Sequence, residues 1–104
     1  MTTIEKLAAT IAARASASAD TSYTAKLLAG GIEKCAKKFG EEAFELALAA
    51  NSKDKAHTAQ EAADVIYHLL VLLQASGVSL AEVEKVLAAR EAQSGLEEKA
   101  SRRG

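Results

Sequence analysis

The stretch that decides the fold is Glu61–Leu73, which reads EAADVIYHLLVLL. At 100° per residue, its apolar positions Ala62 and Ile66 fall on one side of a helix. Val71 and Leu72 fill the other side in its second half, and a helix that is apolar all round is buried on both sides. We therefore expect a long helix with one side packed on its own chain and the other against a partner subunit.

Composition extends this helical interpretation to the whole chain. Of the 104 residues, 49% are hydrophobic and none is proline, and the prevalence of alanine, the best helix former, favours closely packed helices. This length suits a single small domain, residues 1–104, whose modest core would gain from assembly. We expect an all-α bundle of four to five helices, completed by dimerisation: one from near Thr3, Tyr23–Ala29, about Ile32–Ala50, about Ala56–Ser76, and one from Ser79 to about Glu91.

The helix expected over about Ile32–Ala50 carries one apolar stripe. Gly40 lies inside this helix, where glycine costs about 1 kcal/mol relative to alanine, so it indicates either a close helix approach or a local bend. The stripe predicted to be buried consists of Ile32, Cys35, Ala36, Phe39, Ala43, Leu46, Ala47 and Ala50.

Charge and cysteine usage exclude several classes of protein. The formal net charge is -1, so no overall field attracts nucleic acid or an anionic membrane. The single cysteine, Cys35, cannot form an intrachain disulfide and suits a reducing compartment. The start of the chain does not resemble a signal peptide, and the longest apolar run, Leu69–Leu73, is too short to span a bilayer. We expect a soluble, cytoplasmic protein.

Two pairs of carboxylates are the feature that indicates chemistry. Glu42 and Glu45 lie three residues apart in one expected helix, and Glu61 and Asp64 do so in the next. Residues at this spacing project to the same side, and a short loop can bring two antiparallel helices together. Packed carboxylates repel one another and resist ionisation, whereas Mg²⁺ bound through oxygen would remove that repulsion. The alternatives are a solvated acidic face or pairing with Lys or Arg from another segment.

Other polar residues near these acids allow two interpretations. Lys34 and Lys38 share the side of the helix that carries Glu42, where they either form surface salt bridges or neutralise phosphate oxygens beside a metal. Glu41 is expected to face solvent. His68, one turn after Asp64, is interpreted as a packed, hydrogen-bonded residue.

Several strings of residues, from about Ser22 to the C-terminus, form a specific combination. They are Ser22–Leu28 (SYTAKLL), Lys37–Glu45 (KKFGEEAFE), Glu61–Leu73, and the ending Arg90–Gly95 with Glu98, Lys99 and Arg102. Together these strings resemble the phosphoribosyl-ATP pyrophosphohydrolase family. The spacing of the acids alone would place the chain only in the wider MazG-like superfamily of nucleotide pyrophosphohydrolases.

This resemblance implies an all-α, obligate dimeric fold and a Mg²⁺-dependent reaction. The expected reaction is hydrolysis of phosphoribosyl-ATP to phosphoribosyl-AMP and pyrophosphate, the second step of histidine biosynthesis. The four metal-binding positions carried over are Glu42, Glu45, Glu61 and Asp64.

The mechanistic hypothesis is direct attack of a metal-activated water on a phosphorus of the triphosphate. Glu45 is the candidate general base. The candidate phosphate-binding residues are Lys34, Lys38, Arg90, Lys99 and Arg102, since the chain has no Walker-type loop. Two alternatives remain: a house-cleaning nucleoside triphosphate pyrophosphohydrolase with the same metal site, and a non-catalytic helical dimer that serves as an interaction module.

Overall fold

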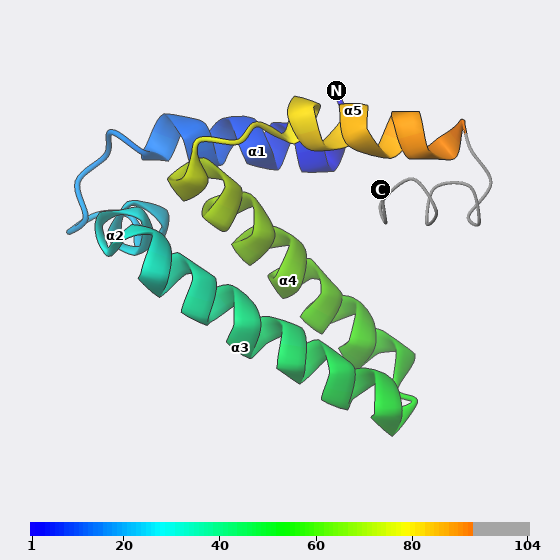
Figure 1. Cartoon of the computed structure of the whole chain (residues 1–104). Coiled ribbons are helices and arrows are strands. Elements are labelled where there is room, and N and C mark those ends of the chain that lie inside the picture. The colour runs from blue at the N-terminus through cyan, green and yellow to red at the C-terminus, as the bar shows by residue number, and fades with distance from the viewer. Residues whose placement is uncertain (93–104) are drawn as a thin grey trace.

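The computed structural model describes residues 1–92, and this part of the chain is all-α, as predicted. Figure 1 shows α3 and α4 as a long hairpin, with α1 and α2 gathered at its open end. The five helices are α1 (Thr3–Arg14), α2 (Tyr23–Ala29), α3 (Gly31–Ser52), α4 (Lys55–Ser76) and α5 (Leu80–Glu91). Each predicted helix is therefore present, with ends within two residues of those expected.

Local capping explains why most of these helices begin where they do. Thr2 and Glu5 form a reciprocal capping box at α1, and Ser79 forms another with Glu82 at α5. Ser22 accepts a hydrogen bond from the Ala25 amide and caps α2. These side chains satisfy amides that have no partner inside the helix. The predicted boundaries at these three helices are confirmed.

The turn between α3 and α4 is shorter than the interval left between the two expected helices, which ended at about Ala50 and began at about Ala56. Asn51 and Ser52 continue α3, Lys53 ends it at φ 64, and Asp54 caps α4 by accepting from the His57 amide at 3.1 Å. A lysine in the left-handed region costs roughly 1–2 kcal/mol. This tight turn lays α4 directly against α3, the most extensive packing in the described part of the chain.

The core lies at the open end of the hairpin, where four helices meet. Leu7, Ala8, Leu28, Leu72 and Ala75 are among the partly buried residues packed against it. Its buried members are Ile11 from α1, Leu27 from α2, Cys35 from α3, and Leu70 and Val71 from α4. The second apolar side of α4 is therefore covered largely by its own chain, so this side does not require a partner subunit, contrary to our expectation.

The buried face of α3 is rotated from the predicted stripe. Ile32 is 53% exposed. Four members of the stripe are inside as expected: Cys35 is buried, and Phe39, Ala43 and Leu46 are half-buried. Ala49 and Glu42, both outside the predicted stripe, are buried and half-buried respectively. Three alanines of the predicted stripe are exposed: Ala36, Ala47 and Ala50.

Gly40 requires neither of the two explanations offered for it. A Cβ atom built at this position meets nothing within 4 Å, and α3 runs through it without a break. The described chain therefore shows no close helix approach at Gly40.

Among residues 1–92, no single helix is both long enough and apolar enough to cross a membrane. Only α4 and α5 taken together pass by length and composition, and they are bent by 108°.

Candidate active site

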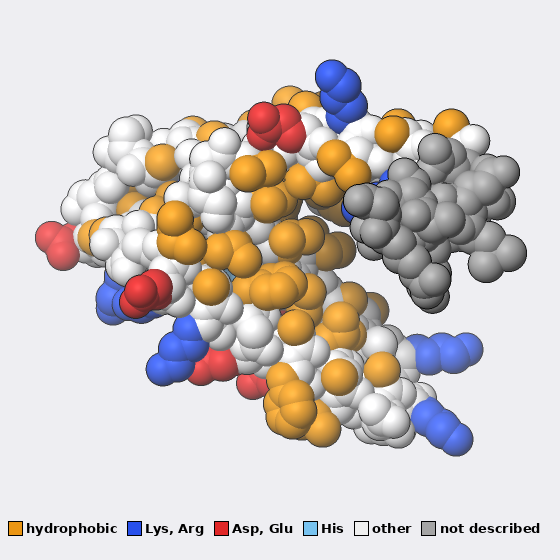
Figure 2. Space-filling view, viewed as in Figure 1, with side chains coloured by type: hydrophobic (Ala, Val, Ile, Leu, Met, Phe, Trp, Pro, Cys, Tyr) orange, Lys and Arg blue, Asp and Glu red, His pale blue; other side chains and the backbone are white. Residues whose placement is uncertain are grey.

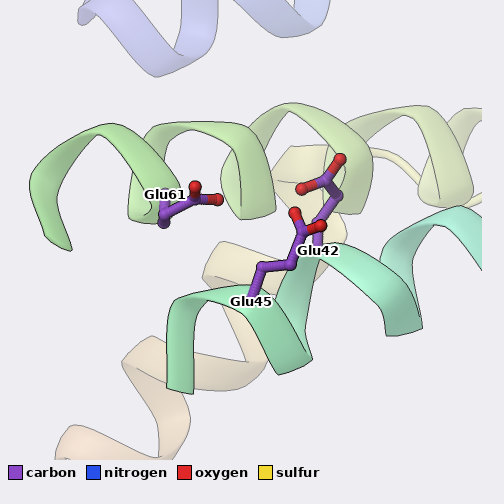
Figure 3. A group of neighbouring side chains, drawn as sticks. All are labelled: Glu42, Glu45 and Glu61. Atoms are coloured by element: carbon purple, nitrogen blue, oxygen red, sulfur yellow. The ribbon is translucent and has the colours of Figure 1, made fainter. Parts of the chain in front are cut away.

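Three glutamates from two helices converge in the middle of the hairpin. Glu42 and Glu45 extend from α3 and Glu61 from α4, and each offers a carboxylate oxygen within 4.8 Å of the others. Figure 3 shows the three side chains pointing into the space between the two helices. We call this group the acidic cluster. It contains three of the four predicted metal ligands.

Burial differs among the members of the acidic cluster. The Glu42 and Glu61 side chains are 16% and 17% exposed, whereas Glu45 lies at the exposed edge. Asp64, the fourth predicted ligand, is exposed and lies outside the cluster, although its charge acts on Glu42. The prediction that all four acids converge is therefore met for three, with Asp64 at the margin.

The acidic cluster is electrostatically strained without a cation. A hydrogen bond shared with Glu45 raises the pKa of Glu42, and partial burial and the negative charges of Glu45 and Asp64 raise it further, against a smaller opposing effect of Lys38. Like charges this close favour a shared proton over two ionised groups. Glu42 therefore binds a proton more tightly than an isolated glutamate does.

An unpartnered oxygen adds a second reason for a cation to bind here. Oε2 of Glu61 is buried and accepts no hydrogen bond within the described chain. A buried acceptor without a partner costs about 1–3 kcal/mol. Hard divalent cations prefer several carboxylate oxygens as ligands, so the residues present fit such an ion.

A buried histidine lies on the other side of Glu42. His68 is 5% exposed, and its Nε2 is 3.8 Å from Oε1 of Glu42. Burial lowers its pKa, as does the charge of Lys38, while Asp64 and Glu41 act the other way. The prediction of a packed histidine is confirmed, but the contact with Glu42 was missed. Its signal was the position of His68 one turn beyond Asp64.

Aromatic rings enclose His68. The Tyr67 ring meets it edge-on at 5.0 Å between centroids, and the Tyr23 ring does so at 6.5 Å. Tyr67 is itself fixed by a 2.6 Å hydrogen bond between its hydroxyl and that of Thr24. This arrangement joins the Ser22–Leu28 string of the sequence to the acidic cluster.

The candidate phosphate-binding lysines line a shallow hollow on α3. Its volume is about 450 Å³, and Lys34, Lys37 and Lys38 form its basic part. Lys38 lies 3.6 Å from Glu41, which is exposed as predicted. An exposed pair of this kind contributes at most about 1 kcal/mol, so Lys38 can exchange Glu41 for another anion at little cost.

Of the three other phosphate-binding candidates, Arg90 belongs to the described residues and two do not. Arg90 is exposed on α5, a helix with no buried residue in the described chain. Lys99 and Arg102 lie outside the described residues.

Cys35 is buried with its Sγ donating to the Leu27 carbonyl at 3.3 Å, and burial raises the pKa of its thiol. A thiol in this state is a poor nucleophile.

Comparisons with known proteins agree with the resemblance seen in the sequence. The family model described as "Phosphoribosyl-ATP pyrophosphohydrolase" matches residues 4–91. A "Phosphoribosyl-ATP pyrophosphatase" of Cereibacter sphaeroides is 61% identical over 102 residues, which cover 98% of this chain and 99% of that protein. "Phosphoribosyl-ATP pyrophosphatase 1" of Rhodopseudomonas palustris is 56% identical over 101 residues, covering 97% and 94%. A "Phosphoribosyl-ATP pyrophosphatase" of Paracoccus denitrificans is 57% identical over 102 residues, which cover 98% of this chain and 94% of that protein.

Proposed function

This chain belongs to the phosphoribosyl-ATP pyrophosphohydrolase family, and from that premise we propose that it hydrolyses phosphoribosyl-ATP to phosphoribosyl-AMP and pyrophosphate. This reaction is the second step of histidine biosynthesis. The observation that carries the proposal, beside family membership, is the acidic cluster with its unpartnered Glu61 oxygen. We further propose that the enzyme works in the cytoplasm, which suits its free Cys35 thiol.

The acidic cluster would hold Mg²⁺ through Glu42, Glu45 and Glu61. A bound Mg²⁺ lowers the pKa of water and offsets negative charge on phosphate oxygens. Asp64 lies one helical turn from Glu61, so a change of side-chain rotamer is the most direct way for it to join the other three. The support for this assignment is the strain described above, since a cation removes both the repulsion and the unsatisfied acceptor.

The chain's own side chains have distinct roles in this reaction. Glu45 would accept a proton from the water that attacks a phosphorus of the triphosphate, a role supported by its position at the exposed edge of the acidic cluster. Lys34 and Lys38 would bind phosphate oxygens, with Lys38 leaving Glu41 to do so. Arg90, Lys99 and Arg102 are further candidates for this role. The anhydride bond between the α and β phosphates breaks, so that phosphoribosyl-AMP and pyrophosphate are the products.

We also propose that the protein is a homodimer. Large hydrophobic side chains are exposed along α3 and α5, and Figure 2 shows hydrophobic side chains gathered over the α3–α4 hairpin. Burial of apolar surface of this kind drives subunit association. The exposed side chains that would supply the interface include Ile32 (53%), Phe44 (65%), Leu48 (57%), Val86 (51%) and Leu87 (55%).

Light scattering after size-exclusion chromatography would test the assembly. Wild-type protein is expected at twice the monomer mass, and Leu48→Glu, which places a charge on the exposed apolar face, at the monomer mass. Because Leu48 is half exposed in the single chain, circular dichroism should show that the helices of the variant remain. A monomeric wild type at micromolar concentration would contradict the dimer.

Pyrophosphate release from phosphoribosyl-ATP tests the activity directly. The assay compares Mg²⁺ with EDTA and includes a panel of ordinary and damaged nucleoside triphosphates. Glu42→Gln keeps the size of the side chain and removes a cation ligand, so it is expected to lower kcat by at least about 100-fold, comparable to the loss of an electrostatic catalytic group. Glu84→Gln, on exposed α5, is the matched control and should keep full activity.

Each outcome of this assay has a definite meaning. Mg²⁺-dependent turnover of phosphoribosyl-ATP alone supports the proposal in full. Turnover only of other triphosphates would keep the metal centre and identify a house-cleaning pyrophosphohydrolase. No turnover of any substrate, with equal Mg²⁺ binding by wild type and Glu42→Gln, would favour a non-catalytic helical module.

A further inference from the structure

We propose that His68 is a positioning residue for the acidic cluster: it holds the Glu42 carboxylate in the orientation that binds a divalent cation. We further infer that the hydrogen bond between Thr24 and Tyr67 fixes His68 in turn. The inference rests on the proposed metal centre and assigns a role to two parts of the chain outside it. These parts are the buried His68 and the start of α2.

The position of Glu42 between two neighbours is the first observation. On one side lies Glu45, with a carboxylate oxygen within 4.8 Å, and on the other Oε1 of Glu42 lies 3.8 Å from Nε2 of His68. That distance is too long for a direct hydrogen bond, which needs about 2.7–3.2 Å. A small rotation of the carboxylate would close it. His68 is thus the neighbour whose Nε2–H can donate a hydrogen bond to Oε1 of Glu42.

A carboxylate has two oxygens, so Glu42 would offer one oxygen to a cation and the other to a hydrogen bond from His68. Oε1 is the oxygen that lies nearest to Nε2 of His68. Hydrogen-bond partners of ligating carboxylates fix their orientation and commonly contribute 10- to 100-fold to metal affinity or activity. A neutral imidazole that donates from Nε2 supplies such a bond.

The rigidity of His68 is the second observation. The imidazole is buried and meets the edges of Tyr67 and Tyr23 at near-perpendicular angles of 83° and 90°. The two tyrosines stack at 6.4 Å, and the Tyr67 hydroxyl bonds to Thr24 at 2.6 Å. Rotation of the imidazole would therefore require the tyrosines to move. Thr24 and Tyr23 belong to the first turn of α2. This turn therefore limits the movement of Tyr67 and His68, and we call it the brace of the site.

His57 provides a matched comparison within the same site. Its Nε2 is also 3.8 Å from a carboxylate of the acidic cluster, Oε1 of Glu61. The His57 side chain is 50% exposed, against 6% for His68. Water competes for an exposed imidazole and leaves it free to rotate. The two histidines lie equally far from their carboxylates, but only His68 is buried. A positioning role is therefore expected for His68 and not for His57.

The test measures Mn²⁺ affinity of the full chain by electron paramagnetic resonance, with no substrate present. His68→Phe keeps a planar ring without a donor, and His68→Gln keeps an N–H near the position of Nε2. We expect His68→Phe to weaken Mn²⁺ binding by about 10- to 100-fold. His68→Gln and the control His57→Phe should stay within a few-fold of wild type, and Thr24→Val should fall between.

The rescue by glutamine separates positioning from packing. Equal Mn²⁺ affinity in wild type and His68→Phe, or equal weakening in His68→Phe and His68→Gln, would overturn the proposal. If His68→Phe fails to fold, Tyr67→Phe removes only a hydroxyl, and wild-type affinity in that variant would overturn the brace. A folded wild type that binds no Mn²⁺ would instead overturn the metal centre itself, while pyrophosphate release under EDTA would contradict the proposed activity's need for a cation.

Discussion

Neutralising Glu61 should stabilise the protein without a cation and remove most of its stabilisation by Mg²⁺. Two unit charges 4.8 Å apart, the largest separation in the acidic cluster, repel by about 1 kcal/mol in water and about 3 kcal/mol at the screening typical of a protein surface. Glu61→Gln removes this repulsion and supplies an amide that can donate to the neighbouring carboxylates. Because the cluster lies partly open to solvent, we expect the lower value, about 1 kcal/mol.

Thermal unfolding with and without Mg²⁺ measures both effects in one series. In EDTA, Glu61→Gln should unfold about 4–8 °C above wild type, since 1 kcal/mol corresponds to this shift for a domain near this size. With Mg²⁺ at about 100 times its dissociation constant, wild type should gain about 2.7 kcal/mol. The variant should gain much less, so the order of stability reverses as Mg²⁺ is added.

The control and the contradicting results are equally specific. Glu84→Gln, exposed on α5, should follow wild type in both conditions. If Glu61→Gln were less stable than wild type in EDTA, the three carboxylates would not be the strained group inferred from the pKa of Glu42. An undiminished gain from Mg²⁺ would show that the cation binds elsewhere.

Three further predictions concern stability. Gly40→Ala should raise the free energy of unfolding by about 0.5–1 kcal/mol in urea titrations, because the added methyl meets nothing within 4 Å; a lower value would show that Gly40 contacts something outside the single chain. Ser79→Ala should cost about 1 kcal/mol in the same assay and leave pyrophosphate release unchanged, because it breaks the capping box with Glu82. In EDTA, the contribution of His68 to stability, measured as the difference between wild type and His68→Phe, should fall as pH drops below 6.5, because the folded-state pKa of His68 lies below that ordinary value and the unfolded chain binds the proton first; a difference that does not change with pH would contradict this.

The helix boundaries could be predicted closely because each depends on residues that lie next to it in the sequence. The capping pairs Thr2 with Glu5 and Ser79 with Glu82 lie within four residues, and Gly77 adopts the left-handed conformation expected past a helix end. These signals do not depend on what the helix packs against. The turn at Lys53 was less predictable, since a lysine at φ 64 is held there by the packing of α3 on α4 rather than by its own preference.

The rotation of α3 could not be predicted from the same information. Alanine occurs on several sides of this helix and buries little surface, so it distinguishes poorly between faces that differ by one residue, or 100°. The structure turns Ala49 and Glu42 inward and leaves Ile32 exposed. The choice is made by the core at the open end of the hairpin, where Cys35 meets Leu27 and Leu70.

Helical geometry explains why each acidic pair divides into an inner and an outer member. Residues three apart on a helix differ by 300°, so their side chains lie about 60° apart around the axis. When Glu42 and Glu61 face the partner helix, Glu45 and Asp64 must therefore turn toward its edge, as their exposure shows. The sequence indicated the three acids that come together, beside Asp64, which lies outside the cluster, but it could not indicate which member of each pair faces inward. That assignment follows from the rotation of α3.

The division of the hairpin into two halves connects stability with function. The apolar core lies at the open end, while the acidic cluster occupies the middle. Toward the turn, Thr58 of α4 joins α3, since its hydroxyl donates to the Ala49 carbonyl at 3.2 Å. An apolar hollow of about 470 Å³ lined by Ala50, Ala59 and Ala62 lies in this half. Since the repelling carboxylates and this hollow both lie outside the buried core, a cation in the cluster would stabilise a part of the chain that the core does not include.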